Sequence, residues 1–141
     1  MKRTGSGEEL GQYAAEFSAG LRPNAAHATV ITLSGELGAG KTTFAQGIAR
    51  ALGVEETVTS PTFVLEKVYQ LEGQRFSRLV HIDAYRLKSA RELEVFGWKE
   101  LLADPANLIV LEWPERVEDA IPEEAIHVRF DIAGDERIIS I

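Results

Sequence analysis

The chain of 141 residues contains no cysteine, which excludes disulfide bonds, thiolate-bound zinc and catalysis by a cysteine nucleophile. Positive charge is also scarce, since 15 Lys and Arg stand against 22 Asp and Glu, giving a formal net charge of -7. Such an acidic chain is poorly suited to hold nucleic acid by its phosphates without help. No run of about 18 apolar residues is present, and no apolar signal core follows residues 1–6. These absences favour a cytoplasmic protein with no membrane span, and the length favours a single domain over residues 1–141.

The spacing of apolar residues predicts alternating helices and strands. Ser6 and Glu9 have the spacing of a capping box at the start of the first helix. The expected helices cover residues 8–21, 41–52, 90–102 with a break near Gly97, and a short acidic segment at 115–120. The expected strands cover residues 28–34, 63–71, 76–83, 108–111, 126–132 and 137–141. Because residues 72–75 and 133–136 are too short to join parallel strands, we expect an α/β fold with a mixed sheet that contains β-hairpins.

One glycine-rich stretch carries the clearest chemical signal. Residues 35–43 read Gly-Glu-Leu-Gly-Ala-Gly-Lys-Thr-Thr and match the pattern G-x-x-x-x-G-K-[ST] without a mismatch. Glycines let successive backbone N–H groups point into one concavity, and the helix that follows directs its positive end at the same place. A chance match has odds of roughly 1 in 200, and the expected strand before and helix after lower them further. We therefore expect nucleotide phosphates to bind Gly35, Gly38, Ala39, Gly40, Lys41, Thr42 and Thr43, with the Thr42 hydroxyl on Mg²⁺.

Two acidic residues come directly after apolar strands. Asp83 ends one strand and Glu112 ends the next, and open α/β sheets bind ligands at the carboxyl ends of their strands. Either acid can ligate Mg²⁺ or position the attacking water, and the spacing does not decide between them. His81, two residues before Asp83, is open to two interpretations, one in the core and one in the site.

The loop before the third strand offers a further candidate. Residues 60–63 read Ser-Pro-Thr-Phe, and in nucleotide switches such a loop often brings a threonine, here Thr62, to the γ-phosphate. An ordinary turn with Pro61 at the strand entry explains the same residues equally well. The guanine-reading run N-K-x-D is absent from the sequence, which leaves ATP favoured over GTP.

Four motifs, read together, resemble those of the TsaE (YjeE) family. They are residues 35–43, residues 60–63, His-Ile-Asp-Ala-Tyr-Arg-Leu at 81–87 and Leu-Glu-Trp-Pro-Glu at 111–115. The resemblance extends over nearly the whole chain and implies a P-loop NTPase-like domain with three layers. Members of this family are bacterial P-loop ATPases of tRNA threonylcarbamoyladenosine biosynthesis, slow when alone. They work with the partner proteins TsaD and TsaB, the first of which performs the transfer.

The resemblance also implies roles for individual residues. Lys41 would bind phosphates, Thr42 would ligate Mg²⁺, and Trp113 would lie near the nucleotide. The implied catalytic set is Glu112, Asp83, Lys41 and Thr62, and the implied Mg²⁺ ligands are Thr42, Glu112 and Asp83. The implied cofactors are ATP and Mg²⁺, and the implied partners are TsaD-like and TsaB-like proteins, with at most indirect or weak contact to tRNA.

Two other functions are compatible with the same glycine-rich loop. A small P-loop kinase would need an acceptor site and an arginine-rich lid, for which 141 residues leave little room. A binding module that switches with ATP but needs no turnover would have the same motifs, and only a test of hydrolysis separates it from an ATPase.

Overall fold

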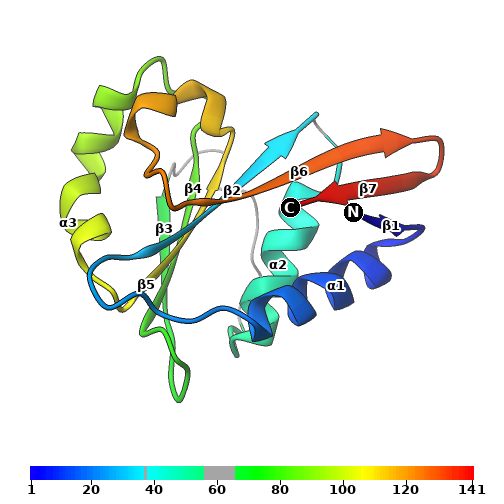
Figure 1. Ribbon diagram of the computed structural model, residues 1–141, viewed down its shortest axis with the longest axis horizontal. Helices are drawn as coiled ribbons and strands as arrows, with labels where there is room; N and C mark the ends of the chain where they lie inside the picture. The colour runs from blue at the N-terminus through cyan, green and yellow to red at the C-terminus, as the bar shows by residue number, and fades with distance from the viewer. Residues whose placement is uncertain (37, 56–65) are drawn as a thin grey trace.

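The computed structural model describes residues 1–36, 38–55 and 66–141. The strands among these residues form one seven-stranded mixed sheet in the order β1-β7-β6-β2-β5-β4-β3, with helices on both faces (Figure 1). The predicted α/β fold with a mixed sheet and hairpins is thereby confirmed. In chain order the elements are β1 (Lys2–Thr4), α1 (Gly7–Ala19), β2 (Thr29–Gly35), α2 (Lys41–Ala51), β3 (Glu66–Gln70), β4 (Arg78–Asp83), η1 (Ala90–Phe96), α3 (Trp98–Ala103), β5 (Asn107–Glu112), η2 (Pro114–Arg116), η3 (Glu118–Ala120), β6 (Ile126–Ala133) and β7 (Glu136–Ser140).

The centre of the sheet is parallel and its margins are antiparallel. β5 lies between β2 and β4, and β2 also pairs with β6, all in parallel. The hairpins β3–β4 and β6–β7 are antiparallel, as the short connections predict, and β1 pairs with β7. All six residues of β5 are buried, which is expected of a strand covered on both faces.

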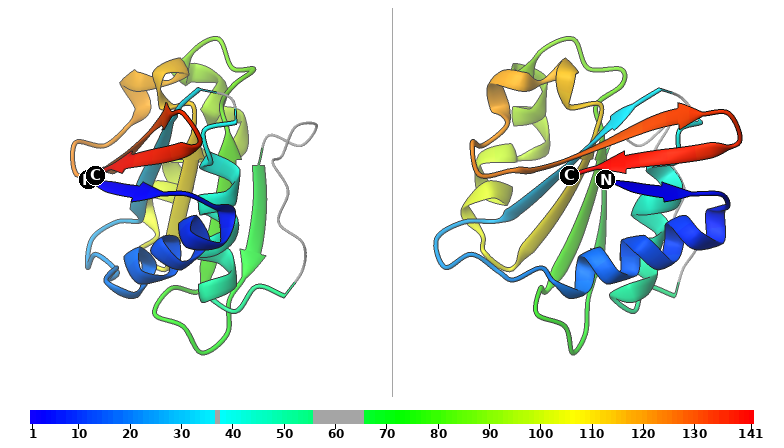
Figure 2. Two further views of the ribbon diagram at one scale, coloured as in Figure 1. Left: turned by 90° about the vertical axis from the view of Figure 1, so that its right-hand side faces the viewer. Right: turned by 45° about the vertical axis from the view of Figure 1, so that its right-hand side comes forward.

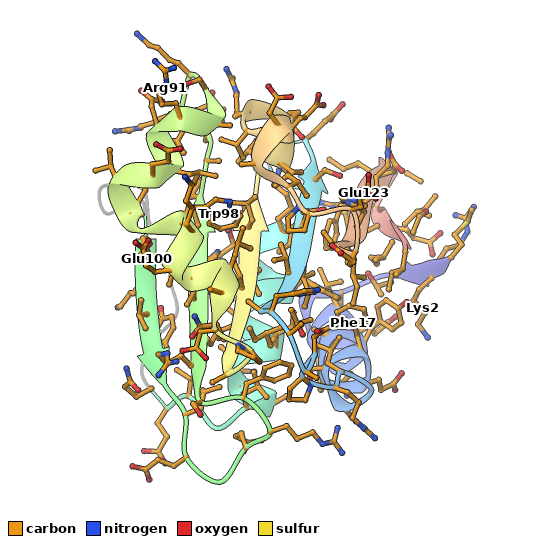
Figure 3. All side chains as sticks on the ribbon, turned by 60° about the vertical axis from the view of Figure 1, so that its left-hand side comes forward. Lys2, Phe17, Arg91, Trp98, Glu100 and Glu123 are labelled. Carbon is orange, nitrogen blue, oxygen red and sulfur yellow. The ribbon has the colours of Figure 1, made fainter. Side chains whose placement is uncertain are left out.

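Each face of the sheet has its own apolar layer. α1 and α2 lie beside each other beneath β6, β7 and β1 (Figure 2) and share one core with Leu33, Val110 and Phe130. The other core joins β2, β4 and β5 to η1, α3 and the segment after β5. Trp98 points from α3 toward the sheet, whereas Arg91 and Glu100 lie on the outer side of that layer (Figure 3).

Local sequence signals account for most element ends. The Ser6 hydroxyl accepts the Glu9 N–H at 3.2 Å and so caps α1, as the capping-box spacing predicts. Gly97, with φ 73°, separates the 3₁₀ turns of η1 from α3, which confirms the expected break.

Two expectations about these elements need correction, and one strand lies outside them. The predicted acidic helix at 115–120 is two 3₁₀ turns, η2 and η3, because Val117 between them leaves the helical region at φ -138°. The segment 90–96 is 3₁₀ rather than α. Strand β1 was not predicted, since three residues are too few to show alternation. The expected strand over 63–71 is described only from Glu66 onward.

Candidate functional site

The glycine-rich loop connects the carboxyl end of β2 to α2. Gly35 has φ 140°, and a Cβ on it would lie 2.4 Å from the Phe130 carbonyl oxygen of β6, so only glycine is accommodated there. Gly38 and Gly40 also have positive φ, at 79° and 109°. Among the described residues, no side chain forms a capping hydrogen bond at the start of α2. The first N–H groups of this 11-residue helix therefore remain available to an anion, which the helix dipole also favours.

Lys41 begins α2 and lies back across the loop. Its side-chain nitrogen donates hydrogen bonds to the carbonyls of Gly35 and Glu36 and stands 3.8 Å from the centre of the Trp113 ring. Burial lowers the pKa of Lys41 from its ordinary value, while the carboxylates of Glu112, Glu115 and Asp83 act in the opposite direction. The loop thus holds a buried cationic group where incoming phosphates would meet it.

The two predicted acids meet at the same edge of the sheet. Asp83 and Glu112 are register partners at the carboxyl ends of β4 and β5, and both are buried. Residues two apart share a face of a strand, and Val110 belongs to the core with α2, so both acids lie on the face that carries α2. The Asp83 carboxylate accepts the Tyr85 N–H at 2.9 Å. Both acids thus stand at the carboxyl ends of neighbouring strands, and their roles at a metal or an attacking water stay predictions.

His81, left open between core and site, belongs to both. It is 1% exposed, and its Nε2 lies 2.6 Å from the Glu112 Oε2. The one sequence signal for this contact is its two-residue spacing from Asp83, which puts the imidazole on the face of the acids.

The donors at this edge are those that Mg²⁺ prefers. Among the described residues no three His, Asp or Glu side chains form a metal cluster, but Mg²⁺ beside a nucleotide is held by one or two protein oxygens together with phosphates and water. Thr42 offers a hydroxyl in the first turn of α2, and Glu112 offers the carboxylate oxygen that His81 does not occupy. Hence the residues present suit a Mg²⁺ ion shared with a phosphate chain.

Trp113 directly follows Glu112 in a left-handed conformation, with φ 62°. Its backbone N–H donates to the Leu33 carbonyl of β2 at 3.2 Å. Its ring contacts both Lys41 and the ring of Tyr85, whose centre lies 5.0 Å from that of the indole. The indole therefore lies beside the lysine of the loop, and its expected place near a nucleotide stays a prediction. Thr62 and the rest of residues 60–63 lie outside the described residues.

A pocket of about 300 Å³ beside the loop was not foreseen as a whole. Its walls come from β1, the start of α1, the loop, α2 and the β6–β7 turn, through Thr4, Ser6, Gly40, Thr43, Asp135 and Arg137. The Thr4 hydroxyl is buried and has no hydrogen-bond partner among the described residues. Arg137 donates to the Gly38 carbonyl at 3.3 Å. Because β1 is so short, the sequence carries no clear sign of this wall.

The strand–loop–helix geometry, the buried lysine and the two strand-end acids define the P-loop NTPase class of protein. The family model described as "Threonylcarbamoyl adenosine biosynthesis protein TsaE" matches residues 4–139. The chain belongs to the TsaE family, which is involved in tRNA threonylcarbamoyladenosine biosynthesis.

Individual relatives agree with this assignment. Two curated proteins named "tRNA threonylcarbamoyladenosine biosynthesis protein TsaE" are similar to this chain. The one from Borreliella burgdorferi is 35% identical over 79% of this chain and 80% of its own length. The one from Streptomyces coelicolor is 43% identical over 74% and 69%. A crystal structure of Bacillus subtilis YdiB superimposes with a TM-score of 0.78 at 32% identity, covering 98% of this chain and 80% of that one. No helix within the described parts of the chain is long and apolar enough to cross a membrane.

Proposed function

We propose that this protein binds Mg·ATP in the loop at residues 35–43 and hydrolyses it. The observation that carries the proposal is the position of Lys41, which is buried, donates to the carbonyls of Gly35 and Glu36, and lies close enough to Glu112 to be influenced by its charge. The loop N–H groups and Lys41 would hold the phosphates, and Thr42 with Glu112 or Asp83 would hold Mg²⁺. Bound Mg²⁺ supplies charge neutralisation for the phosphates. Residues 1–141 would act as one P-loop ATPase domain.

Hydrolysis needs a water in line with the γ-phosphate, and the strand-end acids are the groups able to orient it. Glu112 and Asp83 are register partners on the α2 face of the sheet. Their carboxylates would position the attacking water or hold the metal shell, while Thr62 would approach from the γ-phosphate side. Lys41 would stabilise the charge that develops on the transferred phosphoryl group.

The nucleoside would extend from the phosphates into the pocket between β1 and the loop. This pocket touches Gly38 and Gly40 directly, and its buried Thr4 hydroxyl has no partner among the described residues. A purine carries both donors and acceptors that a hydroxyl can satisfy. Since the sequence lacks N-K-x-D, we favour adenine.

In the pathway, we propose that the ATPase acts on a TsaD–TsaB-like transferase complex rather than performing the threonylcarbamoyl transfer. The names of its relatives supply the pathway, and the formal net charge of -7 favours contact with a protein partner over contact with tRNA phosphates. The protein would act in the cytoplasm. Its ATP turnover would be slow when it is alone and would rise when the partner complex binds.

The test is a comparison of Lys41→Ala with Lys99→Ala, which removes an exposed lysine of α3. We expect Lys41→Ala to lower ATP turnover roughly a hundredfold or more, because a preorganised charge at the phosphates is lost. The control should match the wild type. Turnover and binding of a fluorescent ATP analogue would be measured alone and with TsaD, TsaB and tRNA. Unchanged turnover in Lys41→Ala would refute the site, and wild-type tRNA modification without this protein would refute the role.

A further inference from the structure

His81 is a buried polar side chain within an apolar strand. Its neighbours in β4, Val80 and Ile82, are fully buried and pack into the core, and His81 itself is 1% exposed. Burial of an imidazole costs free energy unless hydrogen bonds replace those to water. We therefore expect the buried imidazole to have a hydrogen-bond partner, which an aliphatic side chain at this position would not need.

Among the residues that the structure describes, that partner is Glu112. The imidazole Nε2 lies 2.6 Å from the Glu112 Oε2, and both side chains are at most 3% exposed. The other ring nitrogen, Nδ1, is buried and has no hydrogen-bond partner among the described residues. The polar contact of the ring is thus directed at one carboxylate oxygen of the candidate acid.

This contact fixes the orientation of Glu112. An ionised carboxylate only accepts hydrogen bonds, so Nε2 carries the hydrogen and donates it to Oε2. The bond occupies Oε2 and leaves Oε1 for other partners. Without it, the Glu112 side chain could turn toward Lys41, to which it is electrostatically attracted and which is needed for phosphates.

We propose that His81 is a positioning residue that holds the Glu112 carboxylate in the orientation needed for ATP hydrolysis. The inference rests on the proposed ATPase function and adds to it a residue that the P-loop pattern does not contain. Groups that orient an active-site ligand in this way typically change activity or metal affinity by 10- to 100-fold when they are removed.

The first experiment compares His81→Leu, His81→Gln and His81→Asn. The Gln amide can reach the place of Nε2, whereas the Asn amide is one methylene shorter. We expect kcat to fall about 10- to 100-fold in the Leu and Asn variants and to recover in the Gln variant, with KM for ATP and binding of Mg·ADP little changed. If the Leu variant does not fold, the Gln and Asn pair gives the same comparison. His127→Leu is the matched control, since His127 lies on β6 and contacts Thr32 at 2.6 Å.

A double-mutant cycle with Glu112→Gln separates positioning from packing. We expect His81→Leu to lower kcat no further once Glu112 is already changed. In urea unfolding of the free protein, the midpoint shift of the double variant should differ from the sum of the shifts of the two single variants. This comparison tests the hydrogen bond without reference to activity.

Each alternative result has a distinct meaning. Wild-type kcat in His81→Leu, equal losses in the Gln and Asn variants, or the same fold-loss with and without Glu112 would each overturn the positioning role while leaving the ATPase proposal intact. A wild-type protein that neither binds nor hydrolyses ATP would overturn both proposals together.

Discussion

Gly35 is the position where backbone geometry and the conformation of the glycine-rich loop depend most directly on each other. It ends β2 opposite Phe130 of β6, with φ 140°, and a Cβ would stand 2.4 Å from the Phe130 carbonyl oxygen. That oxygen belongs to the backbone of a central strand, so it cannot move aside as a flexible side chain would. We predict that Gly35→Ala is severely destabilising and displaces the Gly35 carbonyl, which accepts a hydrogen bond from Lys41.

The magnitude follows from two separate costs. A non-glycine residue held at such a φ costs about 1–3 kcal/mol, and overpacking against rigid neighbours costs about another 1–3 kcal/mol. The expected loss is therefore about 2–6 kcal/mol, a large part of the 5–15 kcal/mol that is typical of a whole domain. Gly38 is the matched control, since its φ is 79° but no other atom in the described parts of the chain comes within 4 Å of an added Cβ. Gly38→Ala should lose only about 1–2 kcal/mol.

Urea unfolding followed by tryptophan fluorescence measures both variants. With a slope of about 2 kcal/mol per molar urea, the midpoint of Gly35→Ala should fall by about 1–3 M and that of Gly38→Ala by less than about 1 M. A Gly35→Ala midpoint equal to the wild type, or less affected than that of Gly38→Ala, would refute the argument from the Phe130 carbonyl.

Further predictions concern the lysine, the helix contact and the second core. Because burial lowers the pKa of Lys41 below 10.5, the unfolded chain binds more protons between the lowered pKa and 10.5. The wild type should therefore gain unfolding free energy as pH rises through that window, whereas Lys41→Met should not, so the unfolding free energy of Lys41→Met minus that of the wild type should fall. A value of this difference that stays constant in urea titrations at several pH values would contradict the shift. In α1, the added Cβ of Gly11→Ala would have no neighbour within 4 Å in the part of the chain that the structure describes, so the change should stabilise by about 1 kcal/mol. In α2, Gly47→Ala would place its Cβ 2.7 Å from that of Ala14 and should destabilise by about 1–2 kcal/mol net; thermal melts showing the same sign for both would refute this. Trp98→Phe removes an indole donor to a carbonyl of η3 at 3.1 Å and should cost about 1–3 kcal/mol by urea unfolding, so an unchanged midpoint would contradict it.

The parts of the site that could be predicted are those that depend only on residues close together in the sequence. The loop at 35–43 lies within one short stretch, and its glycines, lysine and threonine occupy fixed positions relative to one another. Asp83 and Glu112 each follow an apolar run, so their places at strand ends were readable from local pattern alone. The short hairpin connection between β3 and β4 likewise left only antiparallel pairing.

The parts that could not be predicted depend on pairings between distant segments. The register that sets Asp83 opposite Glu112, and His81 within 2.6 Å of that carboxylate, comes from the alignment of β4 with β5. A slip by one residue would send these side chains to the other face. The Thr4 wall of the pocket needs β7 as a partner for β1, which no three-residue pattern reveals.

The sequence by itself determined that this is an α/β chain with a glycine-rich loop before a helix and two strand-end acids, because loop conformation and strand ends are local properties of the backbone. Only the tertiary structure decided that Lys41 is buried against Trp113 and that His81 is bonded to Glu112. These contacts join residues 31 to 72 positions apart in the chain, and the packing of both layers on one sheet brings them together.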